Sequence, residues 1–322
     1  MTAAINIPIA GFIDVYDVAA VDRALQELPA SANEALKSTY EKMLKTGGTR
    51  LAVKLSGIPA MEALYDELPN FARILDDIKK HIALCASSND PMELPPMLLL
   101  GEPGIGKTHF GRRLAQLLAT GFGFVSMSSM TAGWILSGAS SQWKNAKPGK
   151  VFDTLLKGTY ANPVMVIDEV DKAGCDSQYD PLGALYSLLE RDTASQFIDE
   201  FVEIPVDASS VVWVATANHA SRIPEPILNR MSVYEIEPPD ADGARRIAQS
   251  IYTEIRTSHD WGRAFPDAPA ADVLDRLAVF GPRDMRRAIM NGFGNAKLAG
   301  RDEIRLADIS ENRGARKQRI GF

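Results

Sequence analysis

The chain has 322 residues, 46% of them hydrophobic and 24% charged, which is ordinary for a soluble globular protein of two or three domains. No apolar run approaches the ~20 residues needed to span a bilayer, and the N-terminus lacks the features of a secretion signal. The formal net charge of −6 argues against indiscriminate binding to nucleic acid, which relies on a cationic surface. We therefore expect a cytoplasmic protein that makes no membrane contact.

The cysteines and the C-terminal end add two expectations. Cys85 and Cys175 lie far apart and in no metal-ligand spacing, so we expect unpaired thiols in a reducing compartment. The last ten residues, 313–322, carry four cations and no acid. A solvated tail is the simpler interpretation of such a charge run, and a docking element is the alternative.

Residues 1–75 are predicted to form a mostly helical N-terminal region. The first 30 residues are apolar but interrupted by two prolines and a glycine, and no element is assigned to them. Residues 33–44 have the pattern of a helix that Gly47 and Gly48 terminate. Helical spacing of apolar residues continues over 59–85, and prolines then mark a linker.

Residues 76–240 follow a different pattern, in which short apolar runs alternate with longer helical stretches. Continuous apolar strands separated by helices are typical of a parallel sheet covered on both faces. The sequence therefore predicts an α/β domain here and an all-helical domain over 241–322. The expected strands are 97–100, 122–127, 164–167 and 211–216, and the expected helices are 107–119, 241–258, 270–279, 282–298 and 306–312.

A phosphate-binding motif lies between the first expected strand and the helix after it. Eight residues fit G-x-x-x-x-G-K-[ST] in full: Gly101, Glu102, Pro103, Gly104, Ile105, Gly106, Lys107 and Thr108. Backbone N–H groups of such a loop converge on phosphate oxygens, Lys107 would reach the β- and γ-phosphates, and the Thr108 hydroxyl would ligate Mg²⁺. His109 is placed beside the nucleotide and is expected to pack rather than to catalyse. The motif predicts that the chain binds ATP and Mg²⁺.

Two adjacent carboxylates follow the third expected strand. Asp168 and Glu169 would lie at the same sheet edge as the phosphate loop, where open α/β sheets bind ligands. Asp168 is predicted to hold Mg²⁺, and Glu169 to orient or deprotonate the water that attacks the γ-phosphate. An acid pair after a strand can also simply begin a helix, but its position downstream of a phosphate loop favours a catalytic role.

The fourth expected strand ends at Asn218 and precedes the segment Ile223-Pro-Glu-Pro-Ile-Leu-Asn-Arg230-Met231. This stretch resembles the ATPase module of Lon proteases, which belong to the AAA+ class of P-loop NTPases, where a strand ending at a polar sensor precedes an I-P-x-P-L-L-D-R-M segment. The resemblance extends back through Asp168-Glu-Val-Asp-Lys172 and forward to Gly281-Pro-Arg283, and so covers most of the chain. It implies the AAA+ fold, with a parallel sheet flanked by helices and a C-terminal helical lid.

The resemblance also implies roles for three polar residues. Asn218 would be the sensor that positions the lytic water, Arg230 the finger that reaches the neighbouring subunit's nucleotide, and Arg283 the lid sensor for the γ-phosphate. The alternative is that Asn218 is a turn residue and that Arg230 and Arg283 form surface ion pairs. An arginine supplied in trans makes hydrolysis depend on assembly, so a homo-oligomeric ring, a hexamer, is implied. The adenine is expected near Asn70–Ile74.

A Gly- and Ser-rich loop precedes Pro148-Gly149-Lys150. Counting back from these residues, Trp143 matches the aromatic of a Tyr-aliphatic pair that lines the pore of Lon-like rings and grips unfolded polypeptide. Lys144 stands in place of the aliphatic residue. Trp143 and Lys144 are therefore the expected substrate contacts, with burial of Trp143 under the loop as the alternative.

The leading functional hypothesis is an ATP-driven remodeller that unfolds or translocates protein substrates through a ring pore, with a separate peptidase or client left open. No intrinsic peptidase is expected, because nothing here resembles the serine–lysine segment of Lon and the histidines form no catalytic or zinc pattern. A nucleic-acid motor or loader is the second hypothesis, because Trp143 and nearby lysines also suit base stacking and phosphate contacts. A slow nucleotide switch is the third.

Overall fold

The computed structural model describes residues 9–129, 134–173 and 180–310. They form two compact units. The first comprises the residues up to Pro59, Asp76–Gly101 and Lys107–Glu235, and the second comprises Ala60–Leu75, Glu102–Gly106 and the residues from Ile236 onward. Cys175 and the basic segment 313–322 lie outside the described residues.

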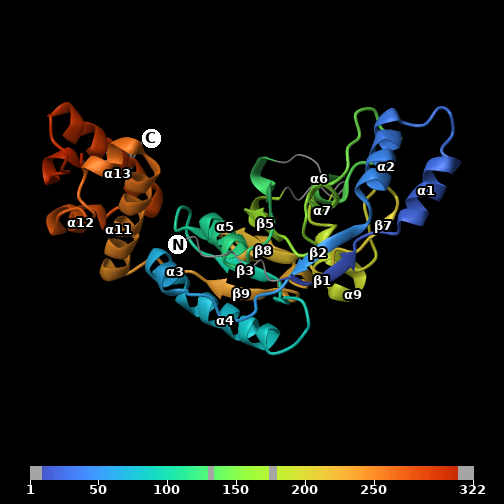
Figure 1. Cartoon of the computed structure of the whole chain (residues 1–322), viewed down its shortest axis with the longest axis horizontal. Coiled ribbons are helices and arrows are strands. Elements are labelled where there is room, and N and C mark those ends of the chain that lie inside the picture. The colour runs from blue at the N-terminus through green and yellow to red at the C-terminus, as the bar shows by residue number, and fades with distance from the viewer. Residues whose placement is uncertain (1–8, 130–133, 174–179, 311–322) are drawn as a thin grey trace, which may run out of the picture. The chain divides into compact units, whose positions relative to one another are not determined.

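The centre of the first unit is a five-stranded parallel sheet with the strand order β4–β5–β8–β3–β9 (Figure 1). Its strands are β3 (Met97–Leu100), β4 (Phe122–Ser126), β5 (Val164–Asp168), β8 (Val212–Ala217) and β9 (Ser232–Glu235). The unbroken apolar sequences of β5 and β8 follow from burial of nearly every residue in them. The predicted parallel α/β fold is confirmed. The edge strand β9 was not predicted, since it is short and only Tyr234 in it is buried.

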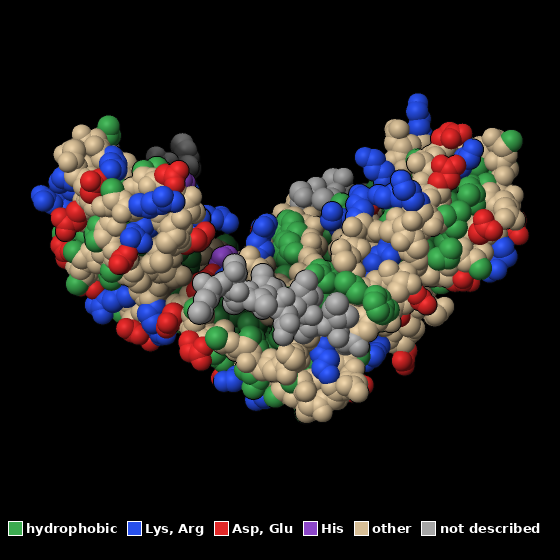
Figure 2. All heavy atoms as spheres, viewed as in Figure 1, with side chains coloured by type: hydrophobic (Ala, Val, Ile, Leu, Met, Phe, Trp, Pro, Cys, Tyr) green, Lys and Arg blue, Asp and Glu red, His purple; other side chains and the backbone are tan. Residues whose placement is uncertain are grey.

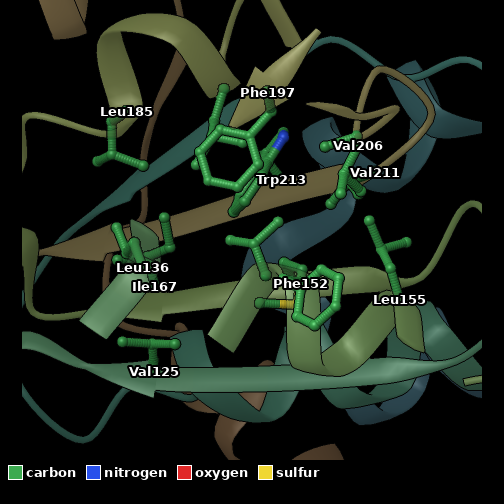
Figure 3. Close-up of a cluster of buried hydrophobic side chains, with 14 of the residues drawn as sticks. Val125, Leu136, Phe152, Leu155, Ile167, Leu185, Phe197, Val206, Val211 and Trp213 are labelled. Carbon is green, nitrogen blue, oxygen red and sulfur yellow. The ribbon is translucent and has the colours of Figure 1, made fainter. Parts of the chain in front are cut away.

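Helices and short strands complete this unit around the sheet. Figure 3 shows side chains of three sheet strands, among them Ile167 and Trp213, meeting Phe152 and Leu155 of α7 in one buried cluster. Burying such a side chain contributes about 1.5–3 kcal/mol, so α7 is fastened firmly to the sheet. The elements are α5 (Lys107–Leu117), α6 (Trp134–Ser137), α7 (Lys150–Lys157), α8 (Leu185–Leu188), α9 (Arg191–Ala194), α10 (Glu225–Leu228), β6 (Phe197–Ile198), β7 (Pro205–Val206) and most of α4 (Ala72–Ala86).

The N-terminal residues contain one predicted helix, α2, and a further helix, α1, that was not predicted. The helices are α1 (Val18–Glu27) and α2 (Glu34–Thr46), the latter capped by the Asn33 side chain and ended by Gly47 at φ 75°. In addition, β1 (Ile9–Asp14) and β2 (Thr49–Val53) form an antiparallel pair. The prediction missed this pair because β1 is irregular near Gly11, which interrupts the alternation that signals a strand.

The described residues of the second unit form helices joined by loops, one of which is Glu102–Gly106. A core of aromatic and aliphatic side chains, with Tyr252 stacked on Phe293, joins its larger helices. The Asp240 side chain caps α11, and Pro282 occupies the first turn of α13, which is why both starts were predictable. The helices are α3 (Glu62–Glu67), α11 (Ala241–Ser258), α12 (Ala271–Leu277) and α13 (Pro282–Leu298), with 3-10 turns at Pro69–Phe71, Asp260–Ala264 and Leu306–Asp308.

Within the described part of the chain, none of the helices combines the length and the apolar character that crossing a membrane requires.

Candidate active site

Three neighbouring strands bring several predicted site residues of the first unit together. β5, β8 and β3 are adjacent and parallel, so their carboxyl ends meet at one edge of the sheet. Asp168 is the last residue of β5, Asn218 follows β8, and Lys107 begins the helix that follows β3. The sheet topology therefore places these three side chains where a ligand of an open α/β sheet is expected.

Lys107 is buried, with 8% of its surface exposed. Its ammonium donates to the carbonyl of Gly101 at 2.5 Å and to Asn218 Oδ1 at 3.0 Å. Burial lowers the pKa of Lys107, and the nearby carboxylates of Asp168, Asp171 and Glu169 oppose that shift. A desolvated ammonium held by two neutral acceptors is a strong candidate for binding an anion.

Asp168 accepts two hydroxyl hydrogen bonds on one oxygen. Thr108 Oγ1 lies 2.7 Å from Asp168 Oδ1, and Thr216 Oγ1 lies 2.8 Å from the same atom. Thr216 Oγ1 also accepts from the backbone N–H of Glu169 at 3.0 Å. Thr216 thus joins the two predicted acids. No role was predicted for it, because a threonine within a buried strand carries no signal in the sequence.

Glu169 has a left-handed backbone conformation, with φ 59° and ψ 49°. A non-glycine residue in this region costs about 1–3 kcal/mol, and such strain is concentrated at functional sites. Its carboxylate pairs with Lys172. The hydrogen bond from Lys172, followed by one from Ser128, lowers the pKa of Glu169, so its carboxylate is ionised near neutral pH.

Asp171 holds the chain directly after β8. Its Oδ2 accepts from the backbone N–H groups of Asn218 and His219, each at 3.1 Å. The other oxygen, Oδ1, is buried and has no hydrogen-bond partner among the described residues. The contact fixes the backbone of Asn218, so Asp171 acts as a positioning residue. Asp171 lies in the segment that follows the two acids, but no role was predicted for it.

The loop Glu102–Gly106 is joined to the first unit by a peptide bond at each end and groups with the second unit. Gly104 and Gly106 have φ 87° and 105°, values that disfavour any side chain and confirm the need for glycine in this motif. Ile105 is buried, whereas Glu102, Pro103 and His109 are exposed. His109 is exposed on α5, and its packing role stays a prediction.

Asn70 contacts this loop within the second unit. Its side-chain amide donates to the Glu237 carbonyl at 3.2 Å and approaches the Ile105 carbonyl at 3.5 Å. Its Oδ1 is buried without a hydrogen-bond partner among the described residues. Since an unpaired buried acceptor is costly, this oxygen is a candidate for receiving a ligand's N–H group.

Arg230 is folded against its own chain. Its Nε lies 2.6 Å from Glu190 Oε1 in an ion pair, its Nη1 donates to the Pro226 carbonyl at 2.6 Å, and its guanidinium lies 5.9 Å from the ring centre of Tyr186. The side chain is 27% exposed. Arg283 is exposed in the first turn of α13, in the second unit.

Trp143 and Lys144 lie in the loop between α6 and α7, and both are exposed. Trp143 is 43% exposed, which excludes burial under the loop. Its ring packs edge-on against Trp134, with the ring centres 5.2 Å apart. Trp134 was not singled out from the sequence.

A family model described as "ATPase family associated with various cellular activities (AAA)" matches residues 97–238, which include all five strands of the sheet and both predicted acids. Residues 97–238 are an AAA ATPase domain. Domains of this family generally bind ATP with Mg²⁺, and AAA+ proteins typically form hexameric rings.

The AAA domain is related to the ATPase modules of Lon proteases, as predicted. The chain is 41% identical over 140 residues to a mitochondrial Lon protease homolog of Schizosaccharomyces pombe, an alignment that covers 44% of this chain and 13% of that protein. It is 32% identical over 239 residues to the Lon protease of Chloroflexus aggregans, covering 71% of this chain and 29% of the relative. The chain thus spans less than a third of the length of either relative.

The fold is also similar to that of Hsp104 in a closed-state cryo-EM reconstruction with ATPγS and casein. The TM-score is 0.60 at 16% identity, and the alignment covers 85% of this chain and 49% of the Hsp104 chain. At this identity the similarity supports the fold alone.

Proposed function

We propose that this chain is an ATP-dependent motor that hydrolyses ATP to remodel, unfold or translocate protein substrates through the pore of a homo-hexameric ring. The observation that carries this proposal is the convergence of Lys107, Asp168, Glu169 and Asn218 at the carboxyl ends of adjacent strands. A buried cation beside two carboxylates and an amide suits phosphoryl transfer, in which the protein positions charged groups around a phosphate.

The phosphates of ATP are assigned to the glycine loop and to Lys107. Gly104 and Gly106 have the positive φ angles of a glycine-rich phosphate loop, and the buried Lys107 ammonium supplies the charge. The adenine is assigned to the neighbourhood of Asn70, whose unpaired Oδ1 would accept from the exocyclic amine. A purine with an amino group satisfies this acceptor, whereas a carbonyl at the same position does not.

Thr108 and Asp168 are the residues that would hold Mg²⁺. Both offer hard oxygen atoms, and their 2.7 Å contact places the two oxygens side by side. A magnesium ion needs only one or two protein ligands when substrate phosphates supply others, so this pair fits. When bound, the ion would neutralise negative charge on the β- and γ-phosphates.

Glu169 is assigned as the base for the lytic water, and Asn218 as the residue that orients it. The ionised carboxylate can accept a proton from water as the oxygen attacks the γ-phosphate. Asp171 and Thr216 support this assignment, because they fix the backbone of Asn218 and of Glu169. Arg230 would act on the nucleotide of the neighbouring subunit after leaving Glu190, and Arg283 would act on its own subunit's γ-phosphate.

A polypeptide is the proposed substrate because the AAA domain is related to those of Lon proteases and because Trp143 is exposed on its loop. Whether a separate peptidase receives the substrate is left open. A nucleic-acid motor is the second candidate, supported by the exposed lysines beside Trp143. A slow switch would instead show little turnover with either polymer.

The test is steady-state ATP turnover of the pure protein alone, with an unfolded protein, and with single- or double-stranded DNA. The proposal predicts stimulation by the unfolded protein and a loss of that stimulation in Trp143→Ala. Stimulation by DNA alone would replace the proposal with the nucleic-acid motor. Slow turnover that neither polymer changes would favour the switch.

A further inference from the structure

Trp134 and Trp143 form one exposed aromatic surface. The two rings meet at an interplanar angle of 79°, with their centres 5.2 Å apart, and the side chains are 38% and 43% exposed. Two tryptophans are expensive to expose to water, because each offers a large apolar area. We call these two rings, packed edge to face and partly exposed, the tryptophan corner.

Lysines are the charged residues of the loop that carries this corner. Lys144, Lys147 and Lys150 are exposed, and residues 103–152 contain no aspartate or glutamate. Of the acids that approach the loop from β6 and the turn after it, Asp199 is buried and accepts three backbone N–H groups, and Glu200 accepts from Ser137. Figure 2 shows lysine and arginine side chains gathered over the region that Figure 1 labels α6 and α7.

The loop that carries the corner is fixed in shape. Asp199 Oδ2 accepts from the Gly149 N–H at 2.7 Å, and the Ala139 N–H donates to the Lys147 carbonyl at 3.1 Å. A Cβ at position 149 would come within 2.2 Å of the Leu136 carbonyl oxygen, so only glycine permits this approach. Asn33, before α2, donates to the Ser141 carbonyl at 2.9 Å. A loop held from both sides presents its side chains with little loss of entropy on binding.

We propose that Trp134 and Trp143 together bind extended polypeptide segments that combine acidic with aromatic or aliphatic side chains. The inference rests on the proposed motor function and names its substrate class. The apolar side chains would enter the corner between the rings, and the carboxylates would pair with Lys144 and Lys147. Single-stranded DNA is the competing ligand, because exposed ring faces and lysines also suit bases and phosphates, and oligo-dT is therefore one of the probes below.

Direct binding tests the inference without reference to hydrolysis. The full chain, saturated with a non-hydrolysable ATP analogue, is titrated into four fluorescein-labelled probes, and anisotropy gives each Kd. The probes are a 20-residue unstructured peptide of Asp, Glu, Phe, Leu and Ser, the same peptide with Lys for every acid, the same peptide with Ser for every apolar residue, and oligo-dT. The first peptide is expected to bind at least about fivefold more tightly than the other three, the ratio for one lost contact of about 1 kcal/mol.

The variants separate the two parts of the surface. Trp134→Ala and Trp143→Ala should each weaken the first peptide at least about fivefold, and each Trp→Phe should retain most of the binding. Lys144→Glu with Lys147→Glu should reverse the preference between the acidic and basic peptides. Lys79→Glu, the same charge change on an exposed residue of α4, should leave the preference unchanged.

Three results would overturn the inference: equal affinity for acidic and basic peptides, tighter binding of oligo-dT, or a Trp134→Ala variant that binds like the wild type. Failure of the motor proposal is a separate outcome. Turnover stimulated by unfolded protein without the charge preference would keep the motor and reject this surface. Charge-selective, Trp134-dependent binding by a chain that does not hydrolyse ATP would keep the surface and reject the motor.

Discussion

Lys107 donates a hydrogen bond to Asn218, 111 residues away in the sequence, with an Nζ–Oδ1 distance of 3.0 Å. The lysine of the phosphate loop and the polar residue at the end of β8 are therefore in direct contact. A phosphate oxygen would compete with Asn218 for the same ammonium. This contact couples the state of the phosphate loop to the residue assigned to orient water.

Replacing Lys107 with alanine is expected to weaken nucleotide binding about 10- to 150-fold or more, because hydrogen bonds to charged groups contribute about 1.5–3 kcal/mol each. Titration with a fluorescent ATP analogue measures the change. Lys79→Ala, which removes an exposed lysine of α4, is the matched control and should bind normally. If Lys107→Ala bound the ATP analogue as tightly as the wild type, Lys107 would not be a phosphate ligand.

Replacing Glu169 with glutamine should separate binding from hydrolysis. The amide keeps the size of the side chain but cannot accept the proton of water, so turnover should fall by about 10²–10⁴-fold while the Kd for ATP stays within about threefold. Parallel binding and turnover assays measure both quantities. Turnover near that of the wild type would assign the base to another residue.

Thr216→Val tests a residue that the sequence did not reveal. Valine preserves the shape but removes the hydroxyl that donates to Asp168 and accepts from the Glu169 N–H. Turnover should fall about 10- to 100-fold, as for other residues that orient catalytic ligands. Thr39→Val on α2 is the control, and equal turnover in both variants would show that Thr216 does not position the acids.

Arg230→Ala should lose hydrolysis yet regain part of it when mixed with Lys107→Ala subunits, because each variant supplies the group that the other lacks. Turnover is measured across mixing ratios, with native mass spectrometry to establish that mixed rings form. Mixed rings without any recovered activity would contradict a finger acting in trans. The ion pair with Glu190 would then be the main role of Arg230.

Asp199 gives a prediction about pH. Burial raises the pKa of its carboxyl from 3.8 to about 7, although three backbone N–H groups oppose the shift. The unfolded chain therefore ionises at lower pH than the folded one, and the native state loses stability as pH rises from about 4 to 7. The loss is up to about 4 kcal/mol and is complete above the folded pKa.

Asp199→Asn should abolish this contribution, since asparagine does not titrate. The asparagine amide nitrogen cannot accept the hydrogen bond that the Gly149 N–H donates, and this loss lowers the free energy of unfolding by about the same amount at every pH. Urea unfolding at pH 4.5, 6 and 7.5 should therefore show a steeper fall for the wild type than for the variant. Parallel curves for the two proteins would contradict the raised pKa.

The parts of the site formed by residues adjacent in the sequence could be predicted, because their function requires particular residue types at fixed spacing. Gly104 and Gly106 need positive φ angles within one loop, and Asp168 with Glu169 directly follows a buried strand. The contacts of Asp171 and Thr216 could not be predicted, because they join residues about 47 positions apart through ordinary turn and strand residues. Only the folded sheet brings them together.

The fold was predictable where elements are buried or capped. β5 and β8 have largely apolar sequences because their side chains are buried on both faces of the sheet, and α11 begins at an Asp240 cap. The edge strand β9 and the β1–β2 pair were missed, since short and half-exposed strands have weak patterns. Trp134 was missed for a related reason, because its importance arises from its contact with Trp143.

Loss of a client protein's native fluorescence would show whether ATP hydrolysis by this chain drives protein unfolding. The client is a fluorescent protein with a long unstructured tail of mixed composition, incubated with the chain and ATP. We expect fluorescence to fall with the wild type and ATP, and to persist with Glu169→Gln or with a non-hydrolysable analogue. Fluorescence that persists while the wild type hydrolyses ATP and binds the tail would contradict the account.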